Sequence, residues 1–188
     1  MTANRFNVFV VGLDDVHLTQ LQTLPGATQY RFHALFSHAE LKQQNHFPVA
    51  MLLDEGIERL RAFPENIDAV VGYWDFPVST VLPVLRQAVG LATTPLESVL
   101  KCEHKYWSRL VQREVIPDHV PAFAAVDPFA EDAVSRPPLP FPFWLKPVKS
   151  VLSHLGFRIS DLASLQCAIR AIRAGIDRYA APFNIILE

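Results

Sequence analysis

Short apolar runs alternate with helical segments along the first 90 residues, and this alternation restricts the chain to few folds. Three runs rich in β-branched and aromatic side chains predict strands, at residues 6–13, 30–36 and 67–73. Three segments with apolar side chains at helical spacing predict helices, at residues 16–24, 52–63 and 78–89. Such alternation is typical of an open parallel sheet, so we expect a Rossmann-like α/β domain over residues 1–96.

The composition changes after about residue 95, and we expect a second, α+β domain over residues 97–188. A short strand at residues 90–92 is expected to end the first domain. The second domain is predicted to hold a helix with Asp161 as its N-cap, because Leu165, Ile169 and Ile172 share one helical face. Its other predicted elements are a helix at 97–114, strands at 121–126, 141–148, 156–159 and 183–187, and a proline-rich loop at 127–140.

Charge and hydropathy exclude several classes of protein. With a net charge of −2 over 188 residues, nothing in the sequence indicates binding to nucleic acid or to a membrane surface. No apolar run reaches the ~20 residues of a membrane-spanning helix, and the first residues lack a signal sequence. We therefore expect a cytoplasmic protein and leave a homodimer open. Cys102 and Cys167 are far apart and are interpreted as packing residues.

Lys146 is the most informative residue of the second domain. It interrupts the aromatic run of residues 141–148, where a desolvated ammonium group costs several kcal/mol unless an anion neutralises it. The alternative is a lysine at a strand end that extends to solvent. Lys105 lies on the preceding predicted helix, and taken alone it reads as an ordinary solvated lysine. The two lysines together suggest a binding site for an anion.

Two segments resemble the ATP-grasp ligases. Residues 90–117 (GLATTPLESVLKCEHKYWSRLVQREVIP) are similar to the segment that leads from the first domain of that family to a nucleotide-contacting lysine, here Lys105. Residues 141–148 (FPFWLKPV) resemble the strand with the second lysine, here Lys146, which a phosphate-covering loop follows. That loop, residues 149–156, departs from the usual pattern because it contains one glycine, Gly156, where many relatives have several.

The resemblance implies a fold, a reaction and a set of binding residues. The first domain would be the pre-ATP-grasp domain, and the chain would stop at the hinge of the ATP-grasp domain, as an inactive fragment of a longer ligase. That ligase would use ATP to activate a small-molecule carboxylate as an acylphosphate, which an amine or thiol attacks. The Mg²⁺ ligands are expected beyond residue 188, and no catalytic residue is assigned. The residues implied to bind ATP are Lys105, Lys146, Lys149, Ser150, Ser153 and Glu188.

Other interpretations stay open. Asp14, Asp15 and Asp75 follow predicted strands, and with Lys146 they loosely resemble a phosphoacceptor receiver domain, although Lys146 is too far along the chain from Asp75 for consecutive strands. These aspartates also fit simple helix caps. A nicotinamide-binding domain is less favoured, since Gly12 stands alone where the pyrophosphate turn needs three glycines. A non-catalytic interaction domain would require Lys105 and Lys146 to point to unrelated surfaces.

Overall fold

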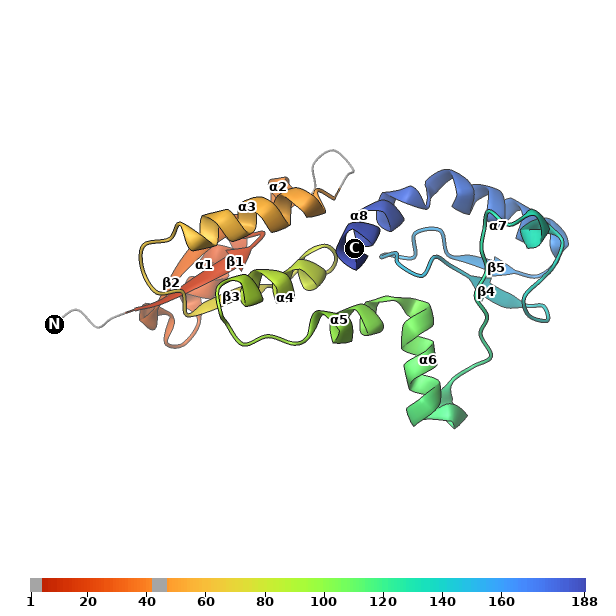
Figure 1. The fold of residues 1–188 in the computed structure, drawn as a ribbon, viewed down its shortest axis with the longest axis horizontal. Helices are drawn as coiled ribbons and strands as arrows, with labels where there is room; N and C mark the ends of the chain where they lie inside the picture. Colours follow the sequence, from red (N-terminus) through yellow and green to blue (C-terminus); the bar gives the residue numbers. More distant parts are fainter. Residues whose placement is uncertain (1–4, 42–46) are drawn as a thin grey trace. The chain divides into compact units, whose positions relative to one another are not determined.

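The computed structural model describes residues 5–41 and 47–188, and its helices and strands are labelled in Figure 1. Contacts between Cα atoms divide the chain into two compact units. The first unit comprises residues 1–99 together with residues 182–188, and the second comprises residues 100–181. The protein thus combines helices and strands in an α/β arrangement, and each unit is described by itself below.

A parallel three-stranded sheet forms the centre of the first unit. Strand β1 (Phe6–Val11) pairs with β2 (Tyr30–Phe36) on one side and with β3 (Ala69–Gly72) on the other, so the strand order is β2-β1-β3. All three predicted strands are confirmed. The residues of β1 after Phe6 are buried, as expected for a central strand that is covered on both faces.

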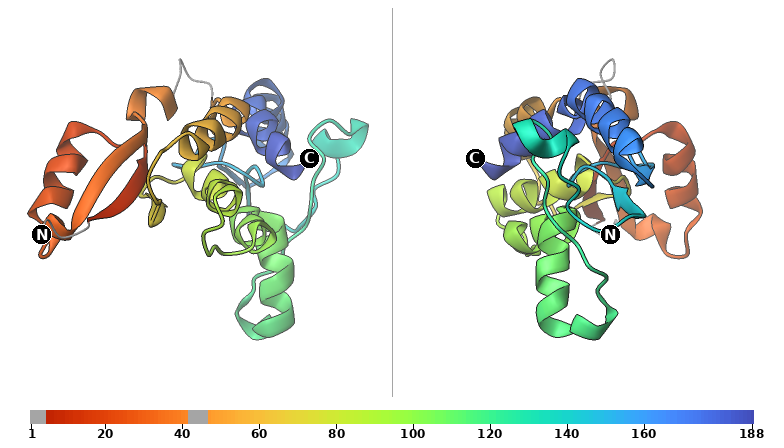
Figure 2. Two further views of the ribbon diagram at one scale, coloured as in Figure 1. Left: turned by 60° about the vertical axis from the view of Figure 1, so that its left-hand side comes forward. Right: turned by 90° about the vertical axis from the view of Figure 1, so that its right-hand side faces the viewer.

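Helices cover both faces of this sheet. Helix α1 (Asp15–Thr23) places Leu18 and Leu21 against Val8 and Val10, whereas α3 (Val49–Arg61) and α4 (Val78–Ala88) lie on the opposite face, as the left view of Figure 2 shows. Gly56 allows α3 to approach closely, because a Cβ atom there would lie 2.8 Å from Leu85 on α4. The short helix α2 (His38–Leu41) follows β2. These helices confirm the predicted alternation.

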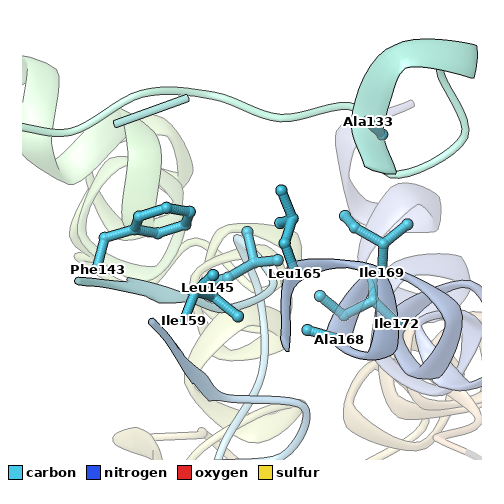
Figure 3. Close-up of a cluster of buried hydrophobic side chains, with 8 residues drawn as sticks. All are labelled: Ala133, Phe143, Leu145, Ile159, Leu165, Ala168, Ile169 and Ile172. Carbon is cyan, nitrogen blue, oxygen red and sulfur yellow. The ribbon is translucent and has the colours of Figure 1, made fainter. Parts of the chain in front are cut away.

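The second unit is organised around one amphipathic helix. Helix α7 (Leu162–Gly175) begins at the predicted cap Asp161, whose carboxylate accepts a hydrogen bond from the Ser164 N–H at 2.7 Å. Its buried face packs on the antiparallel pair β4 (Phe143–Leu145) and β5 (Phe157–Ile159). Figure 3 shows the resulting core, to which the strands contribute Phe143, Leu145 and Ile159 and the helix contributes Leu165, Ala168, Ile169 and Ile172.

The predicted helix at residues 97–114 is two helices. Helix α5 (Leu96–Glu103) ends before His104, and α6 (Lys105–Val115) begins after it. His104 has an extended backbone (φ −79°, ψ 103°), and its Nδ1 accepts a hydrogen bond from the Trp107 N–H at 3.2 Å. This side chain takes the role of an N-cap, which the helical periodicity of the sequence does not reveal.

Three predicted strands are wrong. Residues 183–187 belong to helix α8 (Asp177–Leu187), because Phe183 and Ile186, three residues apart, are the buried positions of this β-branched run. Residues 90–92 and 121–126 are described but form no strand. Gly90 instead ends α4 with a left-handed backbone (φ +73°).

The two cysteines are not packing residues. Cys102 and Cys167 are both exposed free thiols, contrary to the interpretation from the sequence. Within residues 5–41 and 47–188, no helix is both long and apolar enough to cross a membrane.

Candidate anion-binding site

A pocket of about 590 Å³ lies within the second unit. One wall is the side of α6 that carries Lys105, Ser108 and Arg109, and the opposite wall is β4 with the residues that follow it. Apolar side chains of α7, among them Ile169 and Ile172, form part of the lining, and residues 123–126 complete it. Lys105 and Lys146, the two lysines singled out in the sequence, both line this pocket.

The segment that contains Lys146 alternates between exposed and buried residues, as an extended chain does. Exposure alternates from residue 143 to residue 149: the even-numbered residues are exposed and the odd-numbered ones are buried. Trp144, Lys146 and Val148 therefore share one face, as expected for an extended chain whose successive side chains point to opposite sides. All three of them line the pocket, as do Leu145 and Pro147 from the other face, so the alternation alone does not decide which residues line it.

Lys149 is one of the buried residues of this segment, and its environment differs from that of Lys146. Its side chain is only 6% exposed, and its ammonium group forms an ion pair with the carboxylate of Glu103, the last residue of α5, which is 12% exposed. Of the described residues implied to bind ATP, Lys149, Ser150 and Ser153 do not line the pocket. Glu188 follows helix α8, not a strand, and belongs to the first unit.

Lys105 links the two walls of the pocket. Its backbone N–H donates to the Val148 carbonyl at 2.9 Å, and its Nζ donates to the Ser150 carbonyl at 2.9 Å and to the Ser150 Oγ at 3.4 Å. The first residue of α6 is thereby fixed to the segment that follows β4. Ser150, one of the residues implied by the resemblance, thus contacts Lys105.

The loop that follows has an unusual backbone for its sequence. Leu152, Ser153 and Leu155 adopt left-handed conformations, with φ of 51°, 59° and 55°. Glycine occupies this region without strain, whereas other residues do so at a cost of about 1–2 kcal/mol each. Three non-glycine residues of this loop thus adopt a backbone conformation that favours glycine, and Gly156 is the single glycine in the loop. His154 of this loop lies beside the Tyr179 ring, with 5.3 Å between the ring centroids.

Arg109 is a pocket residue that the sequence interpretation missed. It lies four residues after Lys105 on α6, and positions four apart share one face of a helix. Its Nη1 donates to the Gln112 Oε1 at 2.6 Å, and the Gln112 Nε2 donates to the Ser108 Oγ at 3.2 Å. The spacing of the two basic residues was the signal that could have identified it.

The charge of the pocket suits an anion attached to an apolar group. Lys105, Arg109 and Lys146 bring three cationic side chains to the lining, and no aspartate or glutamate among the described residues lines it. The rest of the lining is largely apolar or aromatic, including Phe123 and Trp144. Such a site can bind phosphate or carboxylate groups through charge-assisted hydrogen bonds while it encloses an apolar ring. In the part of the chain that the structure describes, no three His, Cys, Asp or Glu residues gather to hold a metal ion.

His104, at the N-terminus of α6, also lines the pocket. Burial lowers the pKa of its imidazole, and the neighbouring charge of Lys105 lowers this pKa further. The unfolded chain therefore takes up a proton more readily than the folded protein as the pH falls through about 6.5. The contribution of neutral His104 to stability is complete above that pH and is lost as the pH falls through the lowered pKa.

We expect the variant His104→Asn to lose less stability than the wild type between pH 7.5 and pH 5.5. Asparagine keeps a side-chain acceptor for the helix cap but does not titrate. Urea unfolding at both pH values measures the difference. An equal loss in the two proteins would show that His104 does not contribute to the pH dependence. His33, whose pKa burial also lowers, accounts for part of the slope that remains in the variant.

Comparison of the chain with protein-family models, with curated proteins and with solved structures gave no match.

Proposed function

We propose that the second unit binds the phosphates of ATP and that the protein acts as part of an ATP-grasp-type carboxylate ligase. The observation that supports this proposal is that Lys105 and Lys146, from separate elements, line one pocket without a carboxylate among its described lining residues. In this proposal the first unit is the Rossmann-like domain that precedes an ATP-grasp domain. The reaction is the activation of a small-molecule carboxylate as an acylphosphate, which an amine or thiol then attacks.

The pocket supplies the two kinds of contact that a nucleotide needs. The ammonium groups of Lys105 and Lys146 neutralise phosphate charge, which otherwise disfavours transfer of the nucleotide into a partly apolar site. Trp144 on β4 is 65% exposed and lines the same pocket as Lys146, so it offers an aromatic surface for the base. The family resemblance adds Mg²⁺ to the nucleotide. No step is assigned to the metal, because the described residues hold no set of metal ligands.

Titration of the 188-residue protein with Mg·ATP, followed by NMR so that weak binding is also detected, tests the proposal. We expect Lys146→Met to weaken binding about 10- to 100-fold, the effect of losing a hydrogen bond to a charged group. Lys101→Met is the matched control, since Lys101 is exposed on α5 and outside the pocket lining. Equal affinities of the two variants, or no binding to the wild type, would contradict the proposal.

A further inference from the structure

Helix α6 contributes two basic residues to the pocket lining, at different points along its axis. Lys105 is its first residue, and Arg109 follows one turn later, about 6 Å further at 1.5 Å per residue. Flexible side chains of this length could in principle converge on a single phosphate. Their hydrogen-bond partners decide whether they do so.

The partners hold the two charges apart. The Lys105 Nζ is bonded to Ser150, in the segment that follows β4, whereas the Arg109 Nη1 is bonded to Gln112, further along α6. Gln112 is itself held by Ser108, so the guanidinium is supported by a chain of two hydrogen bonds. A side chain positioned in this way loses little further conformational entropy when a ligand binds. Its remaining N–H donors keep the planar fork that matches two oxygens of one phosphate.

We propose that Arg109 is a second phosphate contact and that the pocket selects ligands with at least two linked phosphate groups. One phosphate would lie at Lys105 and Lys146, and the next would lie at the guanidinium of Arg109. Gln112 is a positioning residue, which acts through Arg109. This inference rests on the proposed function, because it assigns a further residue and a ligand preference to the same nucleotide site.

The test compares inorganic phosphate with pyrophosphate as probes of the full chain. Pyrophosphate is the more highly charged and binds more tightly for that reason alone. The decisive quantity is therefore the dissociation constant of phosphate divided by that of pyrophosphate. We expect Arg109→Gln to reduce this ratio about 10-fold, because it removes a contact that only the second phosphate makes. Lys146→Met should weaken the binding of both anions, since each uses the first position.

Arg136→Gln is the matched control. It makes the same change of charge in the second unit at an exposed residue outside the pocket. We expect it to leave the ratio at the wild-type value. Arg109→Lys keeps the charge without the planar fork and should give an intermediate ratio, with the folding of each variant verified by thermal unfolding.

The outcomes separate this inference from the proposed function. An unchanged ratio in Arg109→Gln, together with weaker Mg·ATP binding in Lys146→Met, would overturn only the role of Arg109. Failure of the wild type to bind phosphate, pyrophosphate and Mg·ATP would overturn both proposals. If Arg136→Gln reduces the ratio as much as Arg109→Gln does, the preference for pyrophosphate comes from overall charge, and the inference is overturned.

Discussion

Replacement of Lys149 by methionine is expected to lower the free energy of unfolding by about 3–5 kcal/mol. Methionine keeps an unbranched side chain of similar length, so the main change is the loss of the ammonium group. Glu103, 12% exposed, then retains a buried negative charge without its lysine partner. Removal of one member of a buried ion pair is costly for this reason. Urea unfolding of the variant and the wild type measures the effect.

Two further variants show whether the loss comes from the ion pair. Glu103→Leu combined with Lys149→Met replaces both charges by apolar groups of similar size and should restore most of the stability, since such exchanges are often neutral. Lys146→Met, three residues away on the exposed face, should change stability by less than about 0.5 kcal/mol. A double variant as unstable as Lys149→Met would show that the pair is not the cause.

Gly12→Ala is expected to destabilise the protein by about 2–5 kcal/mol. Gly12 follows β1 with φ +80°, where an alanine costs about 1–2 kcal/mol. Its added Cβ would also overlap the Leu41 side chain and lie 2.7 Å from the Trp74 Cδ1. These neighbours cannot move easily, because Leu41 is 2% exposed and the Trp74 indole is stacked on His38 at 4.3 Å. Overpacking of this kind adds about 1–3 kcal/mol.

Gly90→Ala separates the two causes. Gly90 has a similar backbone, with φ +73°, but an added Cβ there meets nothing within 4 Å. We expect this variant to lose only the backbone contribution of about 1–2 kcal/mol. Thermal or urea unfolding of both variants gives the difference, which measures the steric effect at Gly12. Equal losses of stability in the two variants would show that steric crowding at Gly12 contributes nothing to the effect.

The sheet of the first unit followed from the sequence pattern, whereas the C-terminal residues of that unit did not. Strands β1, β2 and β3 are apolar runs of strand length with turn residues at their ends, so composition and spacing agree. Residues 183–187 form a similar short apolar run, but they lie in a helix because tertiary packing buries positions three apart. A short apolar run does not by itself distinguish these two cases.

The pocket was predictable in part, and one signal in the sequence went unused. The resemblance grouped Lys146 and Lys149 as phosphate contacts, but exposure alternates along residues 143–149, so residues three apart there differ in exposure. Lys146 is exposed like the other even-numbered residues of this segment, whereas Lys149 is buried like Phe143 and Leu145. Its ion pair with Glu103 joins residues 46 positions apart, which no local pattern encodes.

Part of the pocket lining in the second unit is also part of its hydrophobic core. Leu145, Ile169 and Ile172 belong both to the buried cluster of Figure 3 and to the pocket lining. A ligand that fills the pocket therefore contacts side chains that keep this unit folded. Because such a ligand binds the folded state and not the unfolded chain, the melting temperature rises with the fraction of sites occupied. Single substitutions can change the basic lining residues Lys105, Arg109 and Lys146 without altering the core. A change of the shared apolar residues alters the pocket and the interior of the unit together.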